Sequence, residues 1–171
     1  MKRVLLIIAQ RNYQDLELSG TRDVLLEAGF AVELASSKAG ECRGKFGGIE
    51  QADFALRDVV VKEYDCIAFI GGPGAAAFAS DPEALRIANE AARAEIPLGA
   101  ICIAPIILAK ARVLEGRRVT AWDGDGRQST LLTQYGATFT GDSVSVDGRI
   151  VTGNGPDAAQ EFGRALVRMA S

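Results

Sequence analysis

The sequence predicts an α/β protein with a mainly parallel sheet that helices cover on both faces. Short apolar runs alternate with segments of helical spacing along the chain, and this alternation is typical of parallel sheets. The apolar runs are continuous, as in strands that are buried on both faces. The chain has 171 residues, of which 48% are hydrophobic, so we predict a single domain over residues 1–171.

Each predicted strand is a short apolar run that ends at glycine or polar residues. The predicted strands are Lys2–Ala9, Phe30–Ala35, Cys66–Ile70, Leu98–Ile101, Val119–Trp122, Val144–Val146 and Ile150–Thr152. The last two form a hairpin, because Asp147-Gly148 between apolar runs is a strong turn signal. Residues 38–61 are rich in glycine and predict a loop with small strands.

Each predicted helix has apolar residues at helical spacing and a recognisable start or stop. The predicted helices are Asp15–Ala28, Pro82–Ala94, Ala104–Ala111, Ser129–Tyr135 and Pro156–Met169. Gly29 is a suitable C-terminal stop for the first helix. Asp81 is placed to cap the second helix, with proline in its favoured first turn.

Composition excludes several classes of function. The formal net charge is −3, with acidic and basic residues mixed along the chain, which argues against nucleic acid as a partner. No apolar run is long enough to cross a bilayer. Three cysteines in no zinc-binding spacing predict reduced thiols and a cytoplasmic protein. The chain has no histidine, which excludes Ser-His and Cys-His mechanisms within one chain and histidine-ligated metals. We expect no metal and no cofactor.

Cys102 is the strongest candidate for chemistry. A strand of small and branched residues, Leu98–Ile101, runs directly into a helix with Pro105 near its start. This arrangement resembles a nucleophile elbow, which presents a side chain above the sheet at a helix N-terminus. The positive potential there favours thiolate and lowers a thiol pKa. On this segment alone, a small buried structural cysteine is an equally good interpretation.

Other segments carry weaker signals. Gly71-Gly72 ends a neighbouring strand and exposes N–H groups that would suit an anion, although a tight turn explains the same residues. Cys66 opens a core strand and is interpreted as structural, and nothing equips Cys42 for catalysis. Arg43, Lys45 and Phe46 are possible contacts to the site, with no residue-level support.

Three segments together resemble the ThiJ/PfpI superfamily over essentially the whole chain. They are the Gly-Gly strand end, the elbow Ala100-Ile101-Cys102-Ile103-Ala104-Pro105, and Asn154-Gly155-Pro156 before the last helix. The segment Gln14–Leu18 also resembles the acidic helix motif of that family. The resemblance implies a flavodoxin-like three-layer sandwich and a homodimer. It implies Cys102 as the reactive cysteine, Glu17 as its hydrogen-bonding acid, and the N–H groups of Gly72 and Ile103 as oxyanion or sulfinate donors.

The residue after the cysteine selects among the branches of the superfamily. In the peptidase branch this residue is histidine, whereas here it is Ile103, so a cysteine peptidase is disfavoured. The sequence resembles the branch of the parkinsonism-associated redox sensor and deglycase. An isocyanide hydratase fits poorly, because that branch has aspartate at the position of Glu17 and a polar residue at that of Ile103.

Two functions remain open from the sequence. The first is a stress-protective protein whose Cys102 oxidises to sulfenic and then sulfinic acid. The alternative is a cofactor-independent glyoxalase or deglycase, in which Cys102 adds to a methylglyoxal-type aldehyde and Glu17 moves the proton. For both, we expect Glu17 to hold a proton and Cys102 to titrate below a free thiol.

Overall fold

The computed structural model describes residues 1–171 and has a central sheet of seven strands in the order β11-β12-β8-β7-β1-β3-β6. All neighbouring strands in this sheet are parallel except the β11–β12 hairpin. The bounds are β1 Arg3–Ile7, β3 Ala31–Ser36, β6 Phe54–Ala55, β7 Cys66–Phe69, β8 Leu98–Ile101, β11 Val144–Asp147 and β12 Ile150–Gly153.

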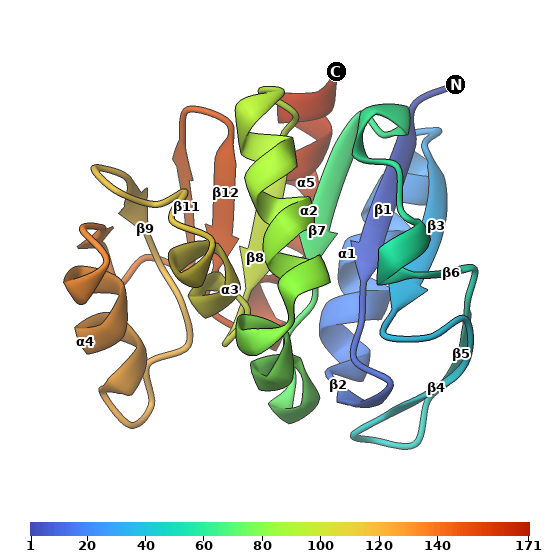
Figure 1. Cartoon of the computed structure of the whole chain (residues 1–171), viewed down its shortest axis with the longest axis horizontal. Coiled ribbons are helices and arrows are strands. Elements are labelled where there is room, and N and C mark those ends of the chain that lie inside the picture. The colour runs from blue at the N-terminus through green and yellow to red at the C-terminus, as the bar shows by residue number, and fades with distance from the viewer.

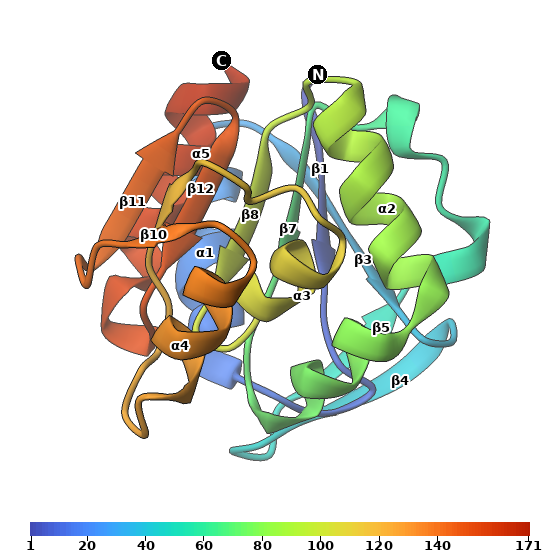
Figure 2. The same cartoon turned by 60° about the vertical axis from the view of Figure 1, so that its left-hand side comes forward.

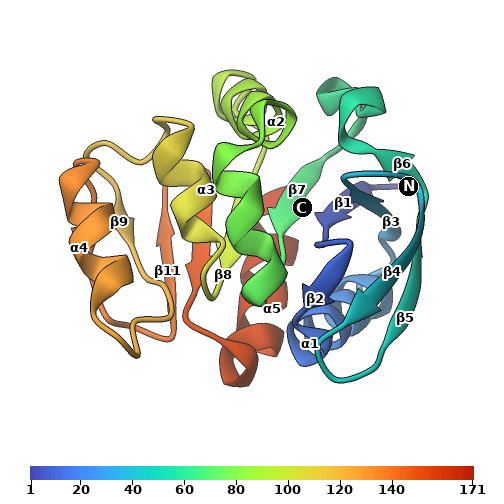
Figure 3. The ribbon, with the colours of Figure 1, turned by 60° about the horizontal axis from the view of Figure 1, so that its bottom comes forward.

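Helices cover both faces of the sheet, as the sequence predicts. Helices α1 (Asp15–Glu27) and α5 (Ala159–Ala170) pack together on one face, and α2 (Pro82–Arg93) and α3 (Pro105–Lys110) lie on the other. Figure 3 shows the three layers, with α2 and α3 above the sheet and α1 and α5 below it. The flavodoxin-like α/β class is therefore confirmed. No helix has the length and apolar character needed to span a membrane.

Local sequence explains why these elements begin and end where they do. The side chain of Asp81 accepts a hydrogen bond from the Glu83 N–H and caps α2, as expected. The predicted strand Leu98–Ile101 has the same bounds in the structure, and all four of its residues are buried. Burial on both faces accounts for its continuous apolar sequence. One cluster of 49 buried residues forms the core.

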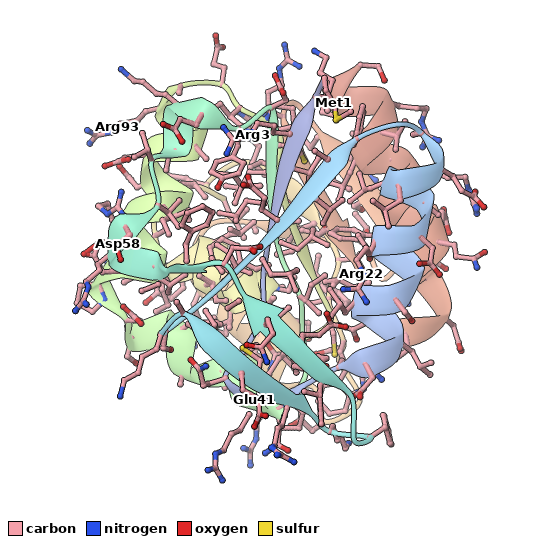
Figure 4. All side chains as sticks on the ribbon, turned by 90° about the vertical axis from the view of Figure 1, so that its right-hand side faces the viewer. Met1, Arg3, Arg22, Glu41, Asp58 and Arg93 are labelled. Carbon is pink, nitrogen blue, oxygen red and sulfur yellow. The ribbon has the colours of Figure 1, made fainter.

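The glycine-rich segment contains small strands, as the sequence predicts. It contains β4 (Gly40–Gly44) and β5 (Ile49–Ala52), an antiparallel ribbon that pairs with β2 (Arg11–Tyr13) in a second sheet. Figure 4 faces this ribbon and shows Arg22 on the side of α1 that is turned towards it. Arg22 forms a two-pronged ion pair with Glu50 of β5, with both N–O distances 2.8 Å. The ribbon is thus fastened to α1.

Several predicted elements differ from the structure. The predicted strand Val119–Trp122 is only the short β9 (Arg118–Val119), which pairs with β10 (Thr138–Phe139). Figure 1 shows β9 and α4 (Arg127–Gln134) beyond β11, at the left of the view, and Figure 2 brings α4 and β10 to the front. The last helix starts at Ala159, after a turn of 3-10 helix over Pro156–Ala158. A 3-10 helix over Pro73–Ser80 was not predicted. Strands of two or three residues are too short to show periodicity.

Candidate functional site

The candidate site lies at the carboxyl ends of β7 and β8, where ligands bind in sheets of this kind. In the orientation of Figure 1 this is the lower edge of the sheet. A pocket of about 400 Å³ opens there, lined by Gln14, Glu17, Lys45, Gly72, Pro73, Cys102, Ile103, Trp122 and Pro156. The structure therefore brings together all four residues that the sequence singled out, Cys102, Glu17, Gly72 and Ile103.

Cys102 follows β8 in a strained backbone conformation. Its φ is 66°, in the left-handed region that residues other than glycine rarely adopt. The Cys102 N–H donates to the Gly153 carbonyl over 2.9 Å, and the Cys102 carbonyl accepts from the Trp122 N–H over 2.8 Å. These two bonds hold the strained residue in place. Strain of this kind at a strand-to-helix turn is the feature of a nucleophile elbow.

Glu17 is fully buried on the first turn of α1. Its Oε1 accepts a hydrogen bond from the Gly71 N–H over 2.9 Å. Its Oε2 is buried and makes no hydrogen bond of ordinary geometry within the chain. Glu17 is nevertheless close enough to the Cys102 thiol for each group to shift the pKa of the other. The two side chains form a buried, coupled acid–thiol pair.

Two glycines make this close approach possible. A Cβ at Gly71 would lie 2.6 Å from the Cys102 Cβ and 2.6 Å from Glu17 Oε1. Gly72 has a φ of 108°, and a Cβ there would lie 2.5 Å from the Asn12 carbonyl oxygen. Neither position has room for a side chain. Glycines here let the backbone N–H groups of the turn face the site.

Burial raises the pKa of both members of the pair. Burial raises the pKa of Glu17 to about 7, although the neighbouring Cys102 thiol and the Gly71 N–H lower it. The pKa of Cys102 is raised to about 12 by burial and by Glu17, although the N–H groups of Gly72 and Ile103 lower it. The expectation of a thiol that titrates below its free value is therefore wrong, because the elbow is more buried than an exposed helix N-terminus.

The raised pKa values change the chemistry that the pair can perform. Near pH 7, a carboxyl group with a pKa of about 7 is present in both protonation states, which is the optimum for a general acid–base group. The thiol is mostly protonated when it meets a ligand. Glu17 is therefore suited to accept the thiol proton while the sulfur forms a bond to the ligand. The pair does not hold a thiolate before the ligand binds.

Two residues of the pocket, Gln14 and Trp122, had no assigned role in the sequence, and Lys45 was named only as a possible contact. Gln14 caps α1 with its side-chain oxygen. Glutamine is not among the preferred N-cap residues, and its place before the helix was the only sign of a special role in the sequence. Trp122 was expected to end a strand but lies in the pocket wall. Lys45 also lines the pocket, whereas Arg43, named with it, pairs with Glu41 instead. Contacts between segments that are distant in sequence bring these residues close to Cys102, and the local sequence does not indicate these contacts.

The other two cysteines lie apart from the pocket lining. Cys66 at the start of β7 is completely buried, and burial raises its pKa to about 12. Cys42 in β4 is also buried, and its thiol contacts the side-chain amide of Gln10 over 3.5 Å. Neither has a carboxyl partner comparable to Glu17. All three cysteines are free thiols.

The chain is similar to known proteins over nearly its full length. The model of the DJ-1/PfpI family matches residues 2–169. The glutathione-independent glyoxalase DJR-1.2 of Caenorhabditis elegans is 29% identical over 166 residues, which cover 97% of this chain and 87% of that protein.

Solved structures agree with this assignment. A ThiJ/PfpI domain protein from Brachyspira murdochii has a TM-score of 0.93 and 26% identity, with 98% of this chain and 95% of that chain covered. Drosophila melanogaster DJ-1beta has a TM-score of 0.88 and 25% identity, with 98% and 89% covered.

Proposed function

We propose that this chain, which belongs to the DJ-1/PfpI family, converts small 2-oxoaldehydes such as methylglyoxal to 2-hydroxy acids. Cys102 would be the nucleophile and Glu17 the acid–base group. The observation that carries the proposal is the buried Cys102–Glu17 pair in a pocket of about 400 Å³. A relative whose name describes a glutathione-independent glyoxalase supports the same activity. Family membership supports the coarser proposal of a stress-protective or deglycase-type role.

The first step is addition of the thiol to the aldehyde carbon. The carboxylate of Glu17 takes the S–H proton as the C–S bond forms, and the carbonyl π electrons move to the aldehyde oxygen. The N–H groups of Gly72 and Ile103 face the sulfur, so they are suited to stabilise this oxyanion. Glu17 then returns the proton, which gives a neutral hemithioacetal.

The second step moves a proton between the two carbons. Glu17 removes the C–H proton of the hemithioacetal carbon, and the electron pair forms an enediolate with the neighbouring carbon. Return of that proton to the neighbouring carbon, together with transfer of the hydroxyl proton from the first oxygen to the second, yields a thioester of a 2-hydroxy acid. Water then cleaves the thioester, which frees the thiol and the acid. The sum is one aldehyde plus one water to one hydroxy acid, with no external oxidant or reductant.

The test is turnover of methylglyoxal by the purified protein, with lactate as the measured product. We expect turnover in the natural chain and none above background in Cys102→Ser. Cys66→Ala is the matched control, because it alters a cysteine outside the pocket lining, and it should retain turnover. Equal lactate formation by the natural chain and Cys102→Ser would refute the proposal.

Redox sensing is the second candidate, favoured by the two N–H donors beside a partly exposed sulfur. One peroxide would convert the thiol to sulfenic acid and water, and a second would give sulfinic acid. The donors and a protonated Glu17 would hold the sulfinate oxygens. Mild peroxide should then add two oxygen atoms selectively to Cys102, as read by peptide mass. The raised thiol pKa makes this reaction slow, which places it second here.

A second copy of the chain is the partner that we expect. Large apolar side chains are exposed on α1 and on the ribbon, with Leu16 60%, Phe46 65% and Ile49 56% accessible. These residues support a homodimer through that surface. Light scattering should give twice the mass of the chain for the natural protein and a lower mass for Ile49→Glu. A monomeric natural protein would contradict the expectation.

A further inference from the structure

The side chain of Gln14 has hydrogen-bond donors that nothing in the chain uses. Gln14 is only 8% exposed, and its Oε1 accepts from the Glu17 N–H over 2.9 Å. That bond fixes the orientation of the amide, so the other amide atom is the donor Nε2. Nε2 donates to no protein group, yet Gln14 lines the pocket. A donor held in this position is available to a ligand.

Lys45 brings a positive charge to the same pocket. It lines the pocket wall and forms no ion pair with any carboxylate of the chain. Glu17 and Cys102 are the only other side chains in the lining that can carry charge. When both are protonated, Lys45 is the only charged side chain in the lining. Such a cation favours an anionic group in the ligand.

The position of Lys45 is set by α1 and not by a loose loop. The carboxylate of Asp15 accepts from the Phe46 N–H over 2.9 Å and from the Gly48 N–H over 2.8 Å. The Lys45 N–H donates to the Tyr13 carbonyl over 2.9 Å. The first turn of α1 therefore holds the backbone that carries Lys45 and also supplies Gln14 and Glu17.

The rest of the pocket wall is apolar. Ile103, Trp122 and Pro156 line it and offer no side-chain charge. The oxyanion donors at Cys102 are used by the reacting carbonyl. The unassigned donors, Gln14 and Lys45, thus suit a second polar group of the substrate, one that is negatively charged and not part of the reacting carbonyls.

We infer that the preferred substrates are 2-oxoaldehydes with a carboxylate at the end remote from the aldehyde, and that Lys45 Nζ and Gln14 Nε2 bind this carboxylate. The inference rests on the proposed function and adds its substrate class. Charge-assisted hydrogen bonds are stronger than neutral ones, so we expect the carboxylate to lower KM more than it changes kcat.

The test compares two aldehydes of the same chain length. In 4,5-dioxopentanoate a carboxylate stands where 2-oxopentanal has a methyl group. The natural chain should favour 4,5-dioxopentanoate by about tenfold or more in kcat/KM, chiefly through KM, since one charge-assisted bond is worth at least about a factor of ten. The preference should shrink as salt concentration rises, because Lys45 is exposed.

Three variants and one control variant test which residues cause the preference. Lys45→Met should bring the ratio of the two kcat/KM values close to one, and Lys45→Arg should restore it. Gln14→Glu keeps the oxygen that caps α1 but replaces the donor with an acceptor, so the ratio should fall. Lys62→Met removes an exposed lysine that does not line this pocket and should leave the ratio at the value of the natural chain.

The outcomes separate the inference from the proposed function. Turnover of neither aldehyde overturns both. Turnover of both with equal kcat/KM overturns the inference alone and leaves the glyoxalase proposal standing. A preference for 4,5-dioxopentanoate that survives in Lys45→Met and in Gln14→Glu also overturns the inference, because the carboxylate would then be bound elsewhere.

Discussion

Cys66 and Cys102 lie on neighbouring parallel strands, at opposite ends of the sheet. Cys66 begins β7, whereas Cys102 directly follows the last residue of β8. Both thiols have a pKa raised to about 12, chiefly by burial. Beyond burial, Cys66 is influenced by Asp65, whereas Cys102 has Glu17 and two N–H donors. A shifted pKa therefore does not by itself distinguish the candidate nucleophile from the structural cysteine.

The two cysteines differ in which end of their strand they occupy. At the carboxyl end of the sheet, glycines and a helix N-terminus leave backbone N–H groups free, and a pocket opens above them. At the amino end of β7 the thiol is enclosed by core side chains. Access and a proton acceptor, more than acidity, therefore distinguish Cys102 from Cys66 as a candidate nucleophile.

Removing the proton acceptor should have the largest effect. Glu17→Gln keeps an oxygen for the Gly71 N–H but cannot take the thiol proton, so kcat/KM for methylglyoxal should fall about 10²–10⁴-fold. Steady-state lactate formation measures this. Cys66→Ala, the comparison at the other end of the sheet, should stay within about twofold of the natural chain. Full activity of Glu17→Gln would show that Cys102 does not depend on a carboxylate as proton acceptor.

Chemical labelling compares the two thiols directly. Iodoacetamide should modify Cys102 at least about a hundredfold faster than Cys66 in the folded protein, because Cys66 reacts only when the core opens. Peptide mass spectrometry at timed intervals gives both rates in one sample. In urea the two rates should converge. Similar rates without urea would show that the amino end of the sheet is as accessible as the pocket.

Glu17 should also reduce stability at neutral and higher pH. The folded state holds the Glu17 proton more tightly than the unfolded state, so the free energy of unfolding falls as pH rises from 4.5 to about 7. The shift corresponds to about 3 kcal/mol. Urea unfolding should therefore find Glu17→Gln more stable than the natural chain by up to this amount at pH 8, with little difference at pH 4. Equal stability at both pH values would argue against a raised pKa.

The backbone strain at Cys102 should give the smallest effect. Because its φ of 66° suits glycine, Cys102→Gly should be more stable than Cys102→Ala by about 1 kcal/mol. Urea midpoints of the two variants measure the difference. At Cys66, in a regular strand, the same pair of substitutions should have the opposite order. If Cys102→Ala were more stable than Cys102→Gly, the backbone at Cys102 would not be strained.

The sequence predicted the frame of the site better than its surroundings. Cys102 and Gly72 were predicted because strand-to-helix turns and glycine pairs are local signals, whereas Glu17 and the donor role of Ile103 came from the family resemblance. Gln14 and Lys45 approach Cys102 only through the packing of α1, β2 and the β4–β5 ribbon. Their roles depend on contacts between segments distant in sequence, which no local pattern encodes.

The pKa of the thiol shows the same limit. A helix N-terminus is visible in the sequence and lowers a thiol pKa. The burial that opposes it depends on how α1 covers the end of β8, and that is a property of the fold. The structure brings the predicted residues together in one pocket, but the direction of the Cys102 pKa shift is opposite to the prediction. The mechanism changes with it, from a resting thiolate to proton removal by Glu17.

The pH dependence of kcat/KM for methylglyoxal shows whether Glu17 accepts the thiol proton of Cys102. Because Glu17 must be ionised to accept the thiol proton, kcat/KM should rise with pH, with an apparent pKa of about 7, and level off above it. The Glu17→Gln variant should lose this step. A rise that appears only towards the pKa of a free thiol, about 8.5, and that persists in Glu17→Gln would contradict the account.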